Sequence, residues 1–573
     1  MRNDSVTGLL FDRIPRQPAV FLKYVGLSQD ALSFYPHRPT LEALIRAADE
    51  VRPGVFPRQE IAEILRRQNE SFGGSDPVRR AIADLAKPDS VAVVTGQQIG
   101  LFTGPILTVY KALTALRLSE ELHRRGFNSV PIFWMASDDH DLAEITRLTI
   151  PGPGSELQVL DSRELLFGTT EMPPRPVGTI GLPETIRQVI DAYGDSFVGE
   201  WSDEIRSRLT SACQPGTTLA DAFGRLMAEL FRDRGLILFD PRDAGAKMLA
   251  TPVIQKALVE TEMLRSQLAE RSRALQDSGL EAQVAILPHS TMVFFEEEGE
   301  RRLLVTRDGE FVSKDTSRHF QLEELLSLTE SAPERFSPNV LLRPLVQDHL
   351  FPTVAYVGGP AEVSYFAEIE PLYRFYGRPM PVVWPRASFT ILAAETRAAM
   401  ERYALRLEDC FEGERHLVRQ ILKGQPARSE VLLAELAGCA DRGIEELKPA
   451  VASADSSLGP AAETIRRKLL HRVSSLRAKF VSFELRQNST LRGELLHLLN
   501  RCYPNGNLQE RELGVHYLLA QLGPQLLDTL YGFVDLGSFT HQVVYHQTPS
   551  AAPTEHTKQR KKGRRSAGLS AEP

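Results

Sequence analysis

Cysteine is scarce in this chain of 573 residues, and the cysteines present lie far apart. The four are Cys213, Cys410, Cys439 and Cys502, and no two of them form a CxxC pair. This spacing excludes the usual structural zinc sites and gives no disulfide framework. Such cysteine usage is typical of a reduced protein, and we expect a cytoplasmic location.

Long apolar runs and an excess of positive charge are missing as well. No stretch approaches the roughly 18–20 apolar residues that a membrane span requires, and the opening residues MRNDSVTGLLFDRIPRQ contain no apolar region typical of a secretory signal. The formal net charge is −7, whereas nucleic-acid-binding proteins usually carry a basic surface. We therefore expect neither a membrane nor nucleic acid as a partner, and any anion site must be local.

The chain is too long for one compact core, so we expect several domains. Up to about residue 390, short apolar runs alternate with amphipathic helical stretches. The runs are VAVVT (91–95), VPIFWMA (130–136), LILFD (236–240), PTVAYVG (352–358) and MPVVWP (380–385). This alternation predicts an α/β core with a parallel, doubly wound sheet over residues 1–387. Within it, residues 283–312 have the pattern of antiparallel strands, so we expect an inserted β-rich segment there.

A helical pattern takes over from residue 388. An apolar stripe with steps of three or four residues consists of Ile465, Leu469, Val473, Leu476, Phe480 and Phe483. Such a stripe fits a helix packed within its own domain or one paired with a partner. We interpret residues 388–500, with helices over 389–423 and 428–448, as an antiparallel coiled-coil arm. We expect the stripe to be largely buried between the helices of this arm, and part of the arm to pair two chains as a homodimer.

Two segments follow the arm. Residues 501–547 we expect to pack back on the core. Residues 548–573 are rich in Pro, Ala and Ser and carry a basic cluster made of Lys558, Arg560, Lys561, Lys562, Arg564 and Arg565. A basic cluster can contact nucleic acid, but this composition favours a solvated, disordered tail.

A glycine-rich turn follows the first predicted strand, in VAVVTGQQIGLFTGPILTVYK (91–111). A strand, such a turn and then a helix place free backbone N–H groups beside a bound ligand. The turn is neither a Walker A loop nor a GxGxxG dinucleotide turn, and an ordinary tight turn would explain it equally well. The candidate binding residues here are Thr95, Gly96, Gln97, Gln98, Gly100 and Gly104.

An acidic cluster follows the next predicted strand. Its members are Asp138, Asp139, His140 and Asp141. In a right-handed βαβ unit both strands point the same way, so this cluster and the TGQQ turn should meet at the carboxyl edge of the sheet, where open α/β sheets bind ligands. The chemistry could be general acid–base work, binding of a substrate ammonium group, or Mg²⁺ ligation. An acidic helix N-cap accounts for one or two of these residues, but not for all.

Two later strand ends carry further candidates. Tyr356, Gly358, Gly359 and Glu362 surround the end of the strand at 352–358, and Arg386 and Ser388 follow the strand at 380–385. An arginine and a hydroxyl at a strand end can hold a phosphate or carboxylate, although a lone arginine is more often a surface ion-pair partner. The chain has no GxSxG elbow and no Cys/His pair of recognisable spacing, which argues against a covalent serine or cysteine hydrolase.

Four stretches together carry a family resemblance: TGQQIGLFTGPILTVYKALTALRLSEEL, PIFWMASDDHDLAEI, FSPNVLLRPLVQDHLFPTVAYVGGPAEVSYFAEI and YPNGNLQER. They resemble the BshC family, the cysteine-adding enzymes of bacillithiol biosynthesis, over residues 10–546. The sequence departs from the commonest pattern at Ser137-Asp138, where a Gly-Glu pair is frequent. Both versions keep an acidic group.

The resemblance implies a Rossmann-like core related to class I aminoacyl-tRNA synthetases and a coiled-coil region that supports dimerisation. It implies a ligase that joins cysteine to glucosaminyl malate to give bacillithiol. By analogy with the synthetases, activation of the cysteine carboxylate would use ATP as cosubstrate, with no tightly bound cofactor and no metal. No KMSKS lysine loop is legible after VVWPRASF.

The same analogy suggests roles for single residues. The aspartates of the acidic cluster would bind an ammonium group, His140 would serve as base, and Arg386 would face the malate carboxylates or a phosphate. Two other interpretations stay open: a non-catalytic coiled-coil scaffold with a degenerate nucleotide-binding core, and a metal-dependent transferase that uses the acidic cluster as ligands.

Overall fold

Five parallel strands form the central sheet, in the order β13-β12-β2-β3-β6. They are β2 (Val91–Gln97), β3 (Ser129–Met135), β6 (Ile237–Phe239), β12 (Thr353–Gly358) and β13 (Val382–Pro385). Each coincides with one of the five apolar runs, so the predicted parallel α/β core is confirmed. The computed structural model describes residues 5–152, 156–168, 173–424, 428–487 and 489–546, and the basic tail lies outside them.

Helices cover both faces of this sheet. On one face, α3 (Leu41–Val51) and α6 (Leu107–Arg124) share a hydrophobic cluster with Val91 and Val93. On the other, Ala92 and Val94 belong to a cluster with α4 (Arg58–Ser71), α12 (Ala244–Val259) and α16 (Pro360–Tyr376). Successive strand residues point to opposite faces. Because both faces are covered, β2 reads as an unbroken apolar run.

An antiparallel sheet lies beside this core, in the order β10-β9-β8-β7-β11. Its strands are β7 (Ser290–Glu297), β8 (Glu300–Arg307), β9 (Glu310–Ser313), β10 (His319–Phe320) and β11 (Phe336–Pro338). The predicted β-rich insertion is therefore confirmed and continues beyond residue 312. Around it lie α13 (Thr261–Asp277), α14 (Leu322–Ser331) and α15 (Arg343–Leu350).

A third sheet joins distant parts of the chain. Here β15 (His541–Tyr545) pairs with β1 (Ser5–Leu9) on one side and with β14 (Ser388–Leu392) on the other. The single helix expected over 389–423 is therefore wrong. The stretch SFTIL is buried and rich in β-branched and aromatic residues, which favours a strand. Three separate helices follow: α17 (Ala394–Arg402), α18 (Leu407–Phe411) and α19 (Glu414–Gly424).

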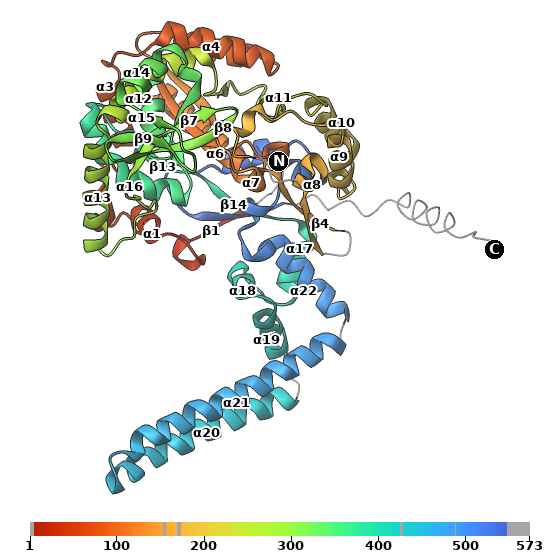
Figure 1. Cartoon of the computed structure of the whole chain (residues 1–573). Coiled ribbons are helices and arrows are strands. Elements are labelled where there is room, and N and C mark those ends of the chain that lie inside the picture. The colour runs from red at the N-terminus through yellow and green to blue at the C-terminus, as the bar shows by residue number, and fades with distance from the viewer. Residues whose placement is uncertain (1–4, 153–155, 169–172, 425–427, 488, 547–573) are drawn as a thin grey trace, which may run out of the picture.

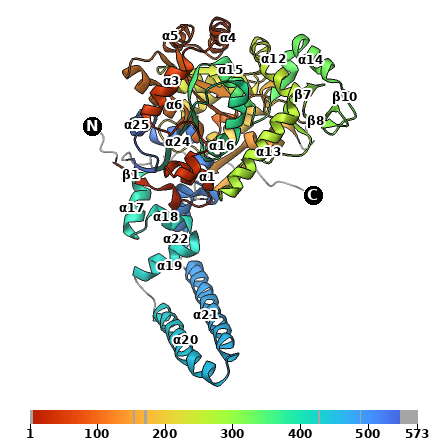
Figure 2. The same cartoon turned by 90° about the vertical axis from the view of Figure 1, so that its left-hand side faces the viewer.

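A long helical hairpin extends from the body of the molecule (Figure 1; Figure 2). It consists of α20 (Arg428–Ala454) and α21 (Leu458–Gln487), which charge pairs connect, among them Lys448 with Glu463 at 2.9 Å and Arg466 with Asp441 at 2.8 Å. The coiled-coil arm of the chain is thus formed by these two helices, and α22 (Ser489–Cys502) packs back against α17 and α19.

The apolar stripe of the arm is not buried within one chain, contrary to expectation. The exposed fractions are 55% for Ile465, 44% for Leu469, 53% for Leu476 and 48% for Phe483. The sequence spacing locates an apolar face of the helix but does not show which surface covers it. In the structure, α21 contacts α20 partly through ion pairs and leaves most of the stripe uncovered.

Residues after α22 fold onto the core through α23 (Gln509–Glu512), α24 (Val515–Leu522), α25 (Leu526–Phe533) and β15. A hairpin of β4 (Arg147–Pro151) and β5 (Leu157–Asp161) lies elsewhere on the body. The remaining helices are α1 (Ala19–Val25), α2 (Gln29–Leu32), α5 (Asp76–Leu85), α7 (Leu142–Thr146), α8 (Ser162–Phe167), α9 (Ile186–Gly194), α10 (Ser202–Ala212) and α11 (Leu219–Leu230). Within the described ranges, no helix combines the length and the apolar character needed to cross a membrane.

Candidate functional site

A cavity of about 550 Å³ lies at the carboxyl ends of β2, β3 and β12. The inserted antiparallel sheet closes another side of it through Phe294 and Arg301. The predicted meeting of the TGQQ turn with the acidic cluster is confirmed, because Gln98 Nε2 donates to Asp139 Oδ2 at 2.6 Å. The cavity has the size typical of small-molecule sites.

The six candidates of the glycine-rich turn have different surroundings. Gly96, Gln97 and Gln98 line the cavity. Gly96 must be a glycine because a Cβ there would lie 2.9 Å from the Trp134 carbonyl oxygen on β3. Thr95 is buried and ties β2 to β12 by donating to the Val357 carbonyl at 2.8 Å.

Gly100 and Gly104 shape the loop rather than the cavity wall. Gly104 has a φ of 66°, in the left-handed region that favours glycine, and a Cβ on Gly100 would lie 2.7 Å from the Gly104 Cα. The pair lets the loop fold back on itself before α6 begins at Leu107, which lines the cavity.

Lys111 and Glu362 form a buried ion pair that fixes the turn. Lys111 Nζ also donates to the Gly96 carbonyl at 2.7 Å and to Gln97 Oε1 at 2.8 Å. Burial lowers the pKa of the Lys111 ammonium, although Glu362 opposes this. For Glu362, burial acts to raise the pKa, but Lys111 and hydrogen bonds outweigh it, so the pKa is lowered and the carboxylate stays ionised. Lys111 was not among the predicted site residues; its signal in the sequence is a lysine within the apolar stretch of α6.

The end of β12 completes this wall. The Gly359 N–H donates to Glu362 Oε2 at 2.8 Å, and the Tyr356 hydroxyl donates to Glu362 Oε1 at 2.5 Å. Gly358 is buried beneath them, where a Cβ would meet the Glu362 Cβ at 3.0 Å. Tyr356, Gly359 and Glu362 line the cavity.

Asp138 is neutralised by cations of the protein itself. Its two oxygens accept from Lys247 Nζ at 2.7 and 2.9 Å, and Arg242 lies 3.5 Å away. Burial opposes ionisation of Asp138, but Lys247 and Arg301 outweigh it and lower the pKa of the carboxyl. Among the described residues, no group of three or more His, Cys, Asp or Glu side chains could hold a metal ion. The pairing of Asp138 with Lys247 and Arg242 therefore disfavours the interpretation of the chain as a metal-dependent transferase.

Asp139 and His140 face the cavity, whereas Asp141 does not. Asp139 Oδ1 accepts from the His140 backbone N–H at 2.7 Å. Asp141 caps α7 by accepting from the Glu144 N–H at 3.0 Å. Asp141 is thus explained as the N-cap of a helix. Of these three residues, only Asp139 and His140 remain candidates for the site.

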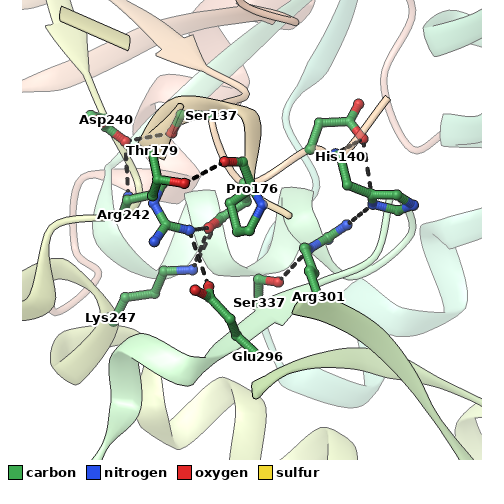
Figure 3. Close-up of polar contacts among 12 residues, drawn as sticks. Ser137, His140, Pro176, Thr179, Asp240, Arg242, Lys247, Glu296, Arg301 and Ser337 are labelled. Atoms are coloured by element: carbon green, nitrogen blue, oxygen red, sulfur yellow. Dashed lines mark hydrogen bonds and ion pairs between the residues drawn. The ribbon is translucent and has the colours of Figure 1, made fainter. Parts of the chain in front are cut away.

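The ring of His140 is held by an arginine from the inserted sheet. Arg301 Nη1 lies 2.9 Å from His140 Nδ1 (Figure 3). A guanidinium has no acceptor, so Nδ1 accepts and the neutral ring carries its proton on Nε2. Burial and the charge of Arg301 lower the pKa of His140, which favours this neutral form. His140 is therefore a hydrogen-bond donor through Nε2, and the expected role of base does not fit this arrangement.

Arg386 and Ser388 are both bonded to the same structural partner, Glu510. Arg386 Nη2 pairs with Glu510 Oε1 at 2.6 Å, and the Ser388 hydroxyl donates to Glu510 Oε2 at 2.8 Å. Arg386 still borders the cavity, whereas Ser388 lies on β14 beside His541. Glu510 lies more than 120 residues further along the chain, so the sequence pattern gave no sign of this pairing.

Three more arginines line the cavity and were not among the predicted site residues: Arg301, Arg343 and Arg511. Arg343 donates to the Tyr365 hydroxyl at 3.1 Å and to Gln347 Oε1 at 2.9 Å, and its guanidinium lies 5.1 Å from the Tyr356 ring centre. Arg343 and Arg511 both lie in stretches that the resemblance had singled out, RPLVQDH and YPNGNLQER.

The fold and the site together define a class of protein: a Rossmann-like α/β core with a ligand cavity at the carboxyl edge of its sheet, extended by a helical coiled coil. Two family profiles match the chain. One is described as "Bacillithiol biosynthesis BshC, N-terminal Rossmann-like domain" over residues 12–387, and the other as "Bacillithiol biosynthesis BshC, C-terminal coiled-coil domain" over residues 389–546. The chain belongs to the BshC family and has a role in bacillithiol biosynthesis.

Curated relatives match almost end to end. A protein of Salinibacter ruber named "Putative cysteine ligase BshC" is 35% identical over 538 residues, which cover 92% of this chain and 96% of that protein. A protein of Koribacter versatilis with the same name is 34% identical and covers 90% and 95%. A solved structure titled as a "putative arginyl t-RNA synthetase" from Campylobacter jejuni aligns with 82% of this chain and 97% of its own, at 10% identity and a TM-score of 0.23, which carries no argument here.

Proposed function

We propose that the chain is a cysteine ligase that joins the carboxylate of L-cysteine to the amine of glucosaminyl malate, the last step in the formation of bacillithiol. The observation that carries this proposal is the cavity itself. It brings a carboxylate, a fixed histidine and several cations together at the carboxyl edge of the sheet, in a chain whose relatives carry the name of cysteine ligases. A non-catalytic scaffold has no need for such a set.

The chemistry requires an activated acid and a free amine. Amide formation from a carboxylate and an amine is uphill in water, so we propose that ATP, bound only as a cosubstrate, activates the cysteine. A carboxylate oxygen of cysteine attacks the α-phosphorus and pyrophosphate leaves. The sugar amine then attacks the acyl carbon, the C–N bond forms, and the C–O bond to AMP breaks.

The described side chains suit the second step. Asp139 is held by Gln98 and by the His140 backbone, so it is positioned to hold the substrate ammonium and take up its proton. His140 Nε2–H is positioned to donate to the oxygen on which negative charge develops. The Lys111–Glu362 pair keeps the turn in place around the reacting groups.

The arm supports a second proposal, a homodimer formed through the coiled coil. A stripe of Ile465, Leu469, Leu476 and Phe483 is about half exposed in the single chain. Each such side chain gains roughly 1.5–3 kcal/mol when fully buried, and two-fold dimers are the commonest homo-oligomers. A second copy would cover this face.

Complementation of a deletion strain tests the proposed ligase. We expect the deletion to abolish bacillithiol and to accumulate glucosaminyl malate in thiol and metabolite profiles. Asp139→Asn should fail to restore bacillithiol, whereas Asp141→Asn is the matched control and should restore it, because Asn is an equally good N-cap. Full complementation by Asp139→Asn would place the chemistry elsewhere, and unchanged bacillithiol in the deletion strain would refute the proposed step.

A further inference from the structure

The side chains of the short helix α23 anchor its backbone to other parts of the fold. Gln509 bonds both the N–H and the carbonyl of Ile391 on β14, at 2.8 and 2.9 Å. Glu510 is the partner of Arg386 and Ser388, and Glu512 accepts from the Thr149 hydroxyl at 2.9 Å. Three of the four residues of α23 are therefore anchored to other parts of the fold.

The fourth residue of α23, Arg511, lines the cavity. Its side chain is exposed, and among the residues that the structure describes no carboxylate lies within ion-pair distance of it. Glu144 interacts with this charge only from beyond ion-pair distance. An arginine held at a cavity wall by a clamped backbone, with no carboxylate in direct contact, is arranged to meet an anion that enters from solvent.

Arg343 is a second cation of the same cavity without a direct ion pair, although Glu362 and Asp348 interact with its charge at longer range. Its hydrogen-bond partners, Gln347 and the Tyr365 hydroxyl, are neutral and engage two of the five guanidinium N–H donors. Within the described part of the chain, no carboxylate pairs with it either. Arg386, by contrast, is already neutralised by Glu510 at 2.6 Å.

The balance of charge over the cavity points the same way. Its lining contains five cationic side chains and three carboxylates, although the whole chain has a net charge of −7. The cations are Lys111, Arg301, Arg343, Arg386 and Arg511, and the carboxylates are Asp138, Asp139 and Glu362. The cavity is thus a cationic site in an acidic protein, which fits a ligand with more than one negative group.

We propose that Arg511 and Arg343 bind the two carboxylates of the malate moiety of the acceptor, in place of Arg386. The identity of this ligand rests on the proposed function, whereas the anion subsite itself stands on the geometry. The acceptor's ammonium group then pairs with Asp139, so cationic and anionic side chains of one cavity bind the two oppositely charged parts of one substrate.

Calorimetric titration of the full-length protein with L-malate tests this subsite. We expect binding that weakens at least tenfold in Arg511→Gln and in Arg343→Gln. Arg66→Gln removes the same charge from the exposed surface of α4, outside the cavity lining, and should leave the affinity unchanged. Thermal unfolding of each variant at the wild-type midpoint shows that the fold is intact.

The outcomes separate this inference from the ligase proposal. No malate binding by the wild type, or equal affinity in Arg511→Gln and Arg66→Gln, overturns the subsite. Arginine-dependent binding of inorganic phosphate without binding of malate also overturns it, because the site then serves a phosphate group. Arginine-dependent malate binding in a protein that forms no amide with cysteine supports the subsite and refutes the ligase proposal.

Discussion

Removing the charge of Glu510 should lower the stability of the fold strongly, whereas its effect on substrate binding should be much smaller. The side chains of Glu510 and Arg386 are 1% and 4% exposed, and the carboxylate accepts from Arg386, from Ser388 and from the Phe389 N–H at 3.0 Å. Burial acts to raise the pKa of Glu510, but Arg386 outweighs it and the pKa is lowered, so the pair is charged. Glu510→Gln leaves the guanidinium of Arg386 buried without its counter-charge.

Breaking a buried ion pair on one side costs about 3–5 kcal/mol. We expect the thermal midpoint of Glu510→Gln to fall by roughly 2–4 °C, measured by scanning fluorimetry and by circular dichroism. Glu401→Gln is the matched control, since Glu401 pairs with Arg397 on the surface, where ion pairs contribute little. The double variant Arg386→Met with Glu510→Met should recover most of the loss, because neither charge is then buried alone. Equal midpoints for Glu510→Gln and Glu401→Gln would refute the structural role given to this pair.

Three further predictions concern the histidine, the arm and acid stability. Nitrogen NMR of the wild type should show the neutral His140 ring protonated at Nε2. Arg301→Gln should shift the population toward the tautomer protonated at Nδ1. An Nδ1–H ring in the wild type would contradict this geometry. Light scattering should find a dimer of wild-type chains of 63.9 kDa each, and Leu476→Asp should give folded monomer, since this side chain is exposed in the single chain; a wild-type monomer at micromolar concentration would exclude the dimer. Burial lowers the pKa of His541 to about 4, below its value of about 6.5 in the unfolded chain, so the unfolded state binds more protons between these values. Stability should hold above pH 6.5 and fall as the pH drops toward 4, with a gentler fall in His541→Gln; an unchanged slope in that variant would exclude this contribution.

The local pattern of the sequence was sufficient to predict the core and part of the candidate site. All five parallel strands follow from short apolar runs, because a sheet covered on both faces leaves few polar positions. The approach of Gln98 to Asp139 follows from topology alone, since parallel strands joined by a helix end at the same edge.

Contacts between distant segments could not be read from the sequence. Arg301 reaches His140 from an inserted sheet, and Glu510 reaches Arg386 from a segment near the end of the chain. No spacing rule relates such positions, because folding brings them together through elements that lie between them. The stripe on α21 shows the same limit, since periodicity identifies an apolar face without identifying its partner.

The most direct test of the central claim uses purified full-length protein with L-cysteine, glucosaminyl malate and ATP. Mass spectrometry should show bacillithiol formed together with AMP, at a rate that Asp139→Asn abolishes and Asp141→Asn preserves. Folded wild-type protein that binds both substrates and yields neither the amide nor AMP would contradict the account.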